Sequence, residues 1–199
     1  SSSLRHWRAP ARDTGSERVS KPVADAHAAL LRLVERDEVD AGGELQRAGA
    51  LRGATAAGKR PTVLFVSHDA SRSGAPRVAL DLVRWLSRNA ALDVRVLLRA
   101  GGELEADFRA AAPTTVATGR DEDRHALDGI SLVFSNTGTN GPFLEALGLG
   151  EIPVLTHVLE LEYSLSVWGL EAFETALRQS SRIVTVAEAV ERYLVEGLG

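Results

Sequence analysis

The sequence predicts an α/β protein in which a parallel sheet carries helices on both faces. From residue 62 onward, short apolar runs alternate with segments of helical periodicity. The run at residues 63–66 is apolar without interruption, which is typical of a strand buried on both faces. A short polar loop follows and leads into a helix, in whose first turn Pro76 is tolerated because proline lacks an N–H.

We interpret residues 1–60 as an N-terminal extension with three parts. Residues 1–19 are polar and rich in arginine without periodicity, which indicates a mobile arm. Ser20 suits the N-cap of a helix that runs to about Asp37. Residues 40–60 are rich in alanine and glycine, which indicates a weak helix and a linker.

From residue 62 to the end we expect strands and helices in alternation. The strands are expected at 62–67, 93–98, 114–117, 130–135, 153–158 and 182–186. The helices are expected at about 76–89, 103–111, 121–127, 142–148, 169–179 and 187–197. Crossovers between parallel strands should be right-handed, and the expected strand order is 3-2-1-4-5-6. This Rossmann-like order puts the loop after the first strand at the point where ligands bind.

The composition excludes several classes of protein. A net charge of −4 argues against a dedicated nucleic-acid binder. The absence of cysteine excludes a disulfide framework and a thiolate zinc site, and it fits a cytoplasmic location. No apolar run approaches ~18 residues, so no membrane-spanning segment is expected. Methionine is absent even at position 1, and we expect a processed product or part of a longer protein.

The loop after the first strand is the first candidate site. Its Ser73, Gly74 and Ala75 precede Pro76 at a helix N-terminus, where free N–H groups suit a phosphate or carboxylate. Gly74 permits either a close approach of a ligand to the backbone or a positive φ. The alternative is an ordinary strand–helix turn. The loop matches neither G-x-G-x-x-G nor a Walker A motif.

His68 and Asp69 belong to the same loop and lie just beyond the carboxyl end of the strand. Ligands of open α/β sheets bind at this edge, so both residues are candidates for binding or catalysis. The alternative is that they only form hydrogen bonds within the loop.

The second candidate is the segment 135–142, which follows a strand and precedes a helix. Its small polar residues, including Asn136 and Thr137, offer amide and hydroxyl groups to a sugar or a phosphate. The alternative is a glycine-rich loop that caps the next helix.

The third candidate lies at the end of the next strand, where His157 and Glu160 need a bend to converge because side chains alternate along a strand. A buried structural role for His157 is the alternative. Glu160 and Glu162 could instead cap the next helix, and Tyr163 and Trp168 suit the core better than a sugar-stacking platform.

The fourth candidate joins the last strand to a helix. Thr185 and Glu188 have the spacing of a capping box, which is the interpretation we favour over a ligand site.

Four segments, taken in order, resemble the N-terminal domain of a GT-B glycosyltransferase of the family-4 type. They are Val-Leu-Phe-Val-Ser-His-Asp…Ser-Gly-Ala-Pro, Leu-Val-Phe-Ser-Asn-Thr, Pro-Val-Leu-Thr-His-Val-Leu-Glu-Leu-Glu and Val-Thr-Val-Ala-Glu-Ala-Val. The resemblance covers Pro61 to the end of the chain. Two positions depart from the family: Ser73-Gly74-Ala75 replaces a Gly-Gly pair, and Leu159 precedes Glu160 where histidine is usual.

The resemblance implies that residues 61–199 are the acceptor-side half of a two-domain enzyme, whose missing C-terminal domain holds the nucleotide-sugar. It implies an unidentified acceptor, no metal and no further cofactor. The catalytic residues that it implies are His157 and Glu160. The substrate-binding residues are Ser73, Gly74, Ala75, Pro76, His68, Asn136 and Thr137.

Three functions therefore compete at this stage. The first is glycosyl transfer, of the hexosyltransferase type, by the longer protein, with this segment inactive alone. The second is a sugar epimerase of the same fold, and the third is a non-catalytic module that binds a glycan or a protein. A second domain with an E-x7-E pattern would favour transfer, because fold alone does not decide function.

Overall fold

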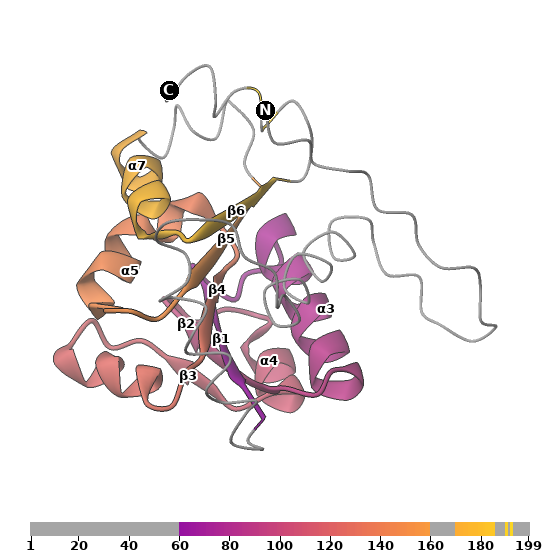
Figure 1. Cartoon of the computed structure of the whole chain (residues 1–199). Helices are drawn as coiled ribbons and strands as arrows, with labels where there is room; N and C mark the ends of the chain where they lie inside the picture. The colour runs from indigo at the N-terminus through magenta and orange to yellow at the C-terminus, as the bar shows by residue number, and fades with distance from the viewer. Residues whose placement is uncertain (1–59, 160–169, 186–189, 191, 193–199) are drawn as a thin grey trace, which may run out of the picture.

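The computed structural model describes residues 60–159, 170–185, 190 and 192. In these residues a six-stranded parallel sheet has the order β3-β2-β1-β4-β5-β6 (Figure 1). The strands are β1 (Thr62–Ser67), β2 (Asp93–Leu98), β3 (Thr114–Val116), β4 (Leu132–Ser135), β5 (Val154–Val158) and β6 (Arg182–Thr185). The predicted α/β, Rossmann-like fold is confirmed, and so is the central position of β1 between β2 and β4.

Helices cover both faces of this sheet, with α3 and α4 on one side and α5 and α7 on the other (Figure 1). The helices are α3 (Gly74–Asn89), α4 (Glu105–Ala111), α5 (Gly141–Leu147) and α7 (Leu170–Gln179). Two 3₁₀ helices lie in the connections, η1 (Asp121–Leu127) and η2 (Gly138–Asn140). None of the helices in the described ranges has the length and hydropathy that a bilayer crossing requires.

The uninterrupted apolar run of β1 is explained by the helices that cover it on both faces of the sheet. Val63 and Phe65 pack into the core beneath α3 and α4, whereas Leu64 and Val66 pack into the core beneath α5. All four side chains are buried. Burying each one stabilises the fold by about 1.5–3 kcal/mol, so polar residues are excluded from both faces of this strand.

Several predicted boundaries shift by one or two residues. Helix α3 begins at Gly74 rather than at position 76, because proline is accepted anywhere in the first turn. Strand β4 begins at Leu132 rather than at position 130, because a turn occupies the preceding positions: Gly129 has φ 72° and Ile130 N–H donates to the carbonyl of Leu127.

The segment 121–127 forms a 3₁₀ helix rather than an α-helix. The carboxylate of Asp123, within this helix, accepts hydrogen bonds from the backbone N–H groups of Thr118 and Gly119 at 2.8–3.1 Å. These bonds hold the tight turn that precedes the helix. The predicted N-terminal helix and linker lie outside the described residues. The predicted helix at 187–197 is described only at Val190 and Arg192, both helical.

Candidate functional site

Three polar side chains lie level with one another at the carboxyl ends of β1, β4 and β5. They are Ser67, Asn136 and His157, which we call the polar row. Val66 pairs with Ser135 and Ser135 pairs with Thr156, so the residues that follow them share one row. Because side chains alternate along a strand, the row faces the same side as Phe134, whose ring centroid lies 6.1 Å from that of His157.

The polar row contains buried atoms that have no hydrogen-bond partner. The Nδ2 of Asn136 donates to Ser67 Oγ at 3.1 Å, and Ser67 Oγ donates to the Asp69 carbonyl at 2.8 Å. However, Asn136 Oδ1 and both ring nitrogens of His157 are buried and have no partner among the residues that the structure describes. Each such atom destabilises the fold by about 1–3 kcal/mol, so a group that supplied the missing partners would bind favourably.

His157 is uncharged at neutral pH. Its side chain is 0% exposed, and burial lowers the pKa of its imidazole to about 4. A neutral imidazole offers one N–H donor and one lone-pair acceptor. Sugar hydroxyls both donate and accept, so either nitrogen could form a hydrogen bond with one. Complete burial also means that a ligand reaches His157 only if the chain that covers it moves. The predicted catalytic partner Glu160 lies outside the described residues, as do Glu162, Tyr163, Trp168 and Glu188.

The loop after β1 satisfies many of its own polar groups. Asp69 Oδ1 accepts from the backbone N–H of Ser71 at 3.0 Å and from Ser71 Oγ at 2.9 Å. His68 Nε2 lies 3.5 Å from Asp69 Oδ2. Burial lowers the pKa of His68, Asp69 opposes this effect, and Arg99 adds to it. These contacts are what the loop interpretation of His68 and Asp69 requires, although His68 Nδ1 stays buried and unpartnered.

The first turn of α3 presents free backbone N–H groups to the surface. The Ser73 side chain makes no capping hydrogen bond, and the N–H groups of Gly74 and Ala75 precede the first intrahelical bond. Gly74 does not have a positive φ, so that part of the prediction is wrong. A Cβ at Gly74 would meet nothing within 4 Å. The open space leaves the other prediction, a close approach of a ligand, intact.

The glycines of the second loop serve packing instead. A Cβ at Gly138 would overlap the ring of Phe173, and one at Gly141 would overlap the backbone of α7 at Ala172 and Ala176. The segment is buried at Ser135, Asn136, Thr137 and Asn140. Thr137 Oγ1 accepts from the N–H of Thr139 at 3.1 Å, as a cap of η2. The structure therefore favours the capping alternative for this segment, except for Asn136, which belongs to the polar row.

Arg99 is a charged residue at this edge that the sequence analysis did not single out. It follows β2 directly, and its backbone N–H donates to the Ser67 carbonyl at 2.8 Å. Burial lowers the pKa of its guanidinium. The signal that could have identified it is its position, since it is the first residue beyond a strand at the carboxyl edge.

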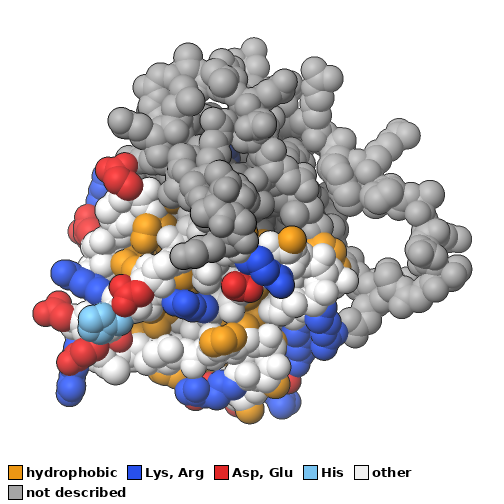
Figure 2. Space-filling view, turned by 60° about the horizontal axis from the view of Figure 1, so that its bottom comes forward, with side chains coloured by type: hydrophobic (Ala, Val, Ile, Leu, Met, Phe, Trp, Pro, Cys, Tyr) orange, Lys and Arg blue, Asp and Glu red, His pale blue; other side chains and the backbone are white. Residues whose placement is uncertain are grey.

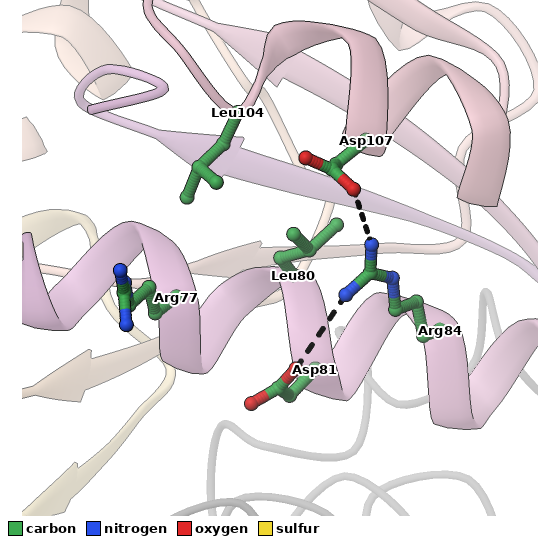
Figure 3. A pocket seen from close by; sticks show the side chains of 6 residues that line it. All are labelled: Arg77, Leu80, Asp81, Arg84, Leu104 and Asp107. Atoms are coloured by element: carbon green, nitrogen blue, oxygen red, sulfur yellow. Dashed lines mark hydrogen bonds and ion pairs between the residues drawn. The ribbon is translucent and has the colours of Figure 1, made fainter. Parts of the chain in front are cut away.

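A pocket of about 210 Å³ between α3 and α4 is a weaker candidate (Figure 3). Arg84 bridges it, with Nη2 at 2.6 Å from Asp107 and Nη1 at 4.0 Å from Asp81. Leu80 and Leu104 also line it. Because its carboxylates already share one arginine, the pocket is explained as a junction between two helices.

The face of the molecule in Figure 2 shows no large patch made of one type of side chain. Basic and acidic side chains are interspersed there, and hydrophobic atoms form small separate patches. Such a surface is typical of solvated protein. No group of three potential metal ligands occurs within the described ranges.

Comparisons with known proteins give no indication of function. No family model matches the chain, and no curated protein matches it. Among solved structures, the chain is similar to shikimate dehydrogenase of Mycobacterium tuberculosis, with a TM-score of 0.40 and 14% sequence identity. The match covers 72% of this chain and 52% of the dehydrogenase, so the chain spans about half the length of that protein. No conclusion about activity follows from a likeness this remote.

Proposed function

We propose that residues 61–199 are the acceptor-side domain of a glycosyltransferase that uses a nucleotide-sugar donor. The observation that carries the proposal is the polar row, with its unpartnered atoms at the carboxyl ends of β1, β4 and β5. In open α/β sheets this edge is where ligands bind. Asn136 Oδ1 would accept from one sugar hydroxyl, while neutral His157 would donate to and accept from others.

The first turn of α3 would act on the donor. As the bond to the sugar breaks, negative charge develops on the leaving diphosphate. The free N–H groups of Gly74 and Ala75, supported by the dipole of a 16-residue helix, would stabilise that charge. The nucleotide itself would be held by the partner domain that the sequence resemblance implies.

His157 would position the acceptor rather than act as a strong base. A pKa of about 4 makes its imidazole a weak proton acceptor at neutral pH. Its neutral form nevertheless fixes the direction of a hydroxyl through one hydrogen bond. Glu160, which the resemblance also implies, stays a prediction for general-base or positioning chemistry.

The direct test is sugar transfer by the full-length gene product with a panel of labelled nucleotide-sugars and glycan acceptors. Asn136→Ala should lower kcat/KM for the acceptor at least tenfold per folded molecule, because Oδ1 loses its ligand contact. Asn89→Ala is the matched control, since Asn89 is exposed at the far end of α3 and, among the described residues, its side chain bonds the Trp85 carbonyl alone. Absence of transfer with every donor, or equal loss in both variants, would contradict the proposal.

The 199-residue chain alone provides a second test. Free nucleoside diphosphates should bind at roughly millimolar Kd or weaker, because a few N–H contacts supply only a few kcal/mol. Micromolar binding in calorimetry would show a complete nucleotide pocket and contradict the half-site. Glycan binding without transfer by the full-length product would instead identify a binding module, and conversion of the nucleotide-sugar without acceptor would identify an epimerase.

A further inference from the structure

Arg99 is anchored at the carboxyl edge by uncharged groups. Its Nη1 donates to the Thr139 carbonyl at 3.0 Å and lies 3.3 Å from Asn140 Oδ1. Its guanidinium carbon lies 5.6 Å from the centroid of the Phe143 ring. These three residues belong to η2 and α5, so the side chain reaches over the α5 face of the sheet.

The charge of Arg99 has no acidic counterpart within the described part of the chain. Other arginines differ: Arg84 lies 2.6 Å from Asp107, and Arg109 lies 2.9 Å from Glu105. Asp69, the acid of the neighbouring loop after β1, is already engaged by Ser71 and faces His68. Arg99 is exposed, so an anion can reach its positive charge, and hydrogen bonds between ionised partners are stronger than those between neutral groups.

The geometry leaves the binding edge of the guanidinium open. Only Nη1 makes hydrogen bonds to described residues, so Nε and Nη2 have donors to spare. Two N–H groups side by side form the fork that binds carboxylates and phosphates with two hydrogen bonds. Because the ring of Phe143 and the Nη1 bonds already hold the side chain, little conformational entropy is lost on binding.

We propose that Arg99 forms an anion subsite that takes the phosphate or carboxylate group of an acidic sugar. His68 lies beside Arg99 because the two follow paired positions of β1 and β2. Assigning the sugar as acceptor rests on the proposed function, whereas anion binding at Arg99 does not. Arg99 contacts α5, so the anion would bind on the opposite face of the sheet from both the first turn of α3 and the polar row, and the comparison of sugar phosphate with UDP below tests the acceptor assignment.

The experiment is an amide NMR titration of the 199-residue chain with glucose 6-phosphate, glucuronate, inorganic phosphate, UDP and uncharged glucose. We expect glucose 6-phosphate or glucuronate to shift the amides of Arg99 and Thr139, and to bind at least tenfold more tightly than glucose. Arg99→Gln should weaken this binding at least tenfold. Arg99→Lys, which keeps the charge but loses the fork, should fall between the two.

Arg95→Gln is the matched control. Arg95 lies on the same strand but away from the carboxyl edge of the sheet. Its Nη1 donates to the Asp128 carbonyl, at a distance of 2.9 Å. Its removal should change the affinity for the sugar acid less than twofold.

Three outcomes would contradict parts of the proposal. Equal affinity of Arg99→Gln and the wild type, or amide shifts confined to residues away from Arg99, would overturn the subsite. Tighter binding of UDP than of sugar phosphate at Arg99 would overturn the acceptor assignment. Anion binding without sugar transfer in the full-length product would leave the subsite and remove the glycosyltransferase.

Discussion

The loop after β1 and the loop after β4 look alike in sequence but are built for different tasks. Both are short, polar and glycine-containing, and both lead from a strand of the sheet into a helix. The first is largely exposed from Arg72 to Gly74, with open space at its glycine. The second is buried, and its two glycines lie against α7.

The difference shows that a glycine in a loop can serve either of two purposes, access for a ligand or close packing against another element. At Gly74 the absent Cβ leaves room that a ligand can use, while at Gly141 it leaves room that another helix already fills. Neither position has a positive φ, so backbone conformation does not distinguish them. Only the neighbours in space do. Substitution at the two glycines should therefore have opposite consequences for stability and for activity.

The largest effect is expected for Gly141→Ala. Its Cβ would overlap backbone atoms of α7, which cannot rotate away as a side chain can. We expect a loss of at least about 3 kcal/mol in the free energy of unfolding, the upper end of the range for overpacking. Urea denaturation followed by circular dichroism measures it. A loss below about 1 kcal/mol would mean that α7 is not held tightly against this loop.

The second effect concerns pH and two histidines, His68 in the loop after β1 and His157 in β5, beside the loop after β4. Since burial holds the pKa of His157 at about 4, below its ordinary 6.5, the unfolded chain binds the proton more readily between these values. Its contribution to stability is present above pH 6.5 and is lost as the pH falls towards 4. Between pH 7 and pH 5 the free energy of unfolding should fall by about 2 kcal/mol from this group.

Urea titrations at both pH values test this expectation. His157→Gln should remove most of that pH dependence. His68→Gln should remove less, because His68 is only partly buried and Asp69 opposes the effect of burial on its pKa. An unchanged pH dependence in His157→Gln would mean that His157 is hydrated in solution.

The smallest effect on stability is expected for Gly74→Val. The position has no neighbour within 4 Å of a Cβ, so the free energy of unfolding should change by less than about 1 kcal/mol. If the proposed donor role is right, turnover by the full-length product should fall at least tenfold, because the branched side chain keeps the diphosphate from the N–H groups. Both quantities are to be measured on one sample. Normal turnover per folded molecule would remove this loop from the site.

The sequence by itself determined the order of the strands and of the helices α3, α4, α5 and α7, and hence the sheet, but not the 3₁₀ form of 121–127. Uninterrupted apolar runs such as 63–66 favour a strand covered on both faces, and the alternation with helices favours parallel connections. These are local patterns, which chain connectivity and handed crossovers convert into one topology. The edge of the sheet that carries the candidate site followed from the same reasoning.

Only the tertiary structure decided which polar residues share that edge and which are free. Register placed Ser67, Asn136 and His157 in one row from three strands, a relation that no spacing along the chain encodes. Packing against α7 assigned Gly141 to structure, and burial made His157 neutral. That Arg99 has no acidic partner among the described residues became visible only once its neighbours were known to be a carbonyl, an amide and a ring. Burial and partnership depend on residues distant in the sequence, whereas secondary structure depends largely on near ones.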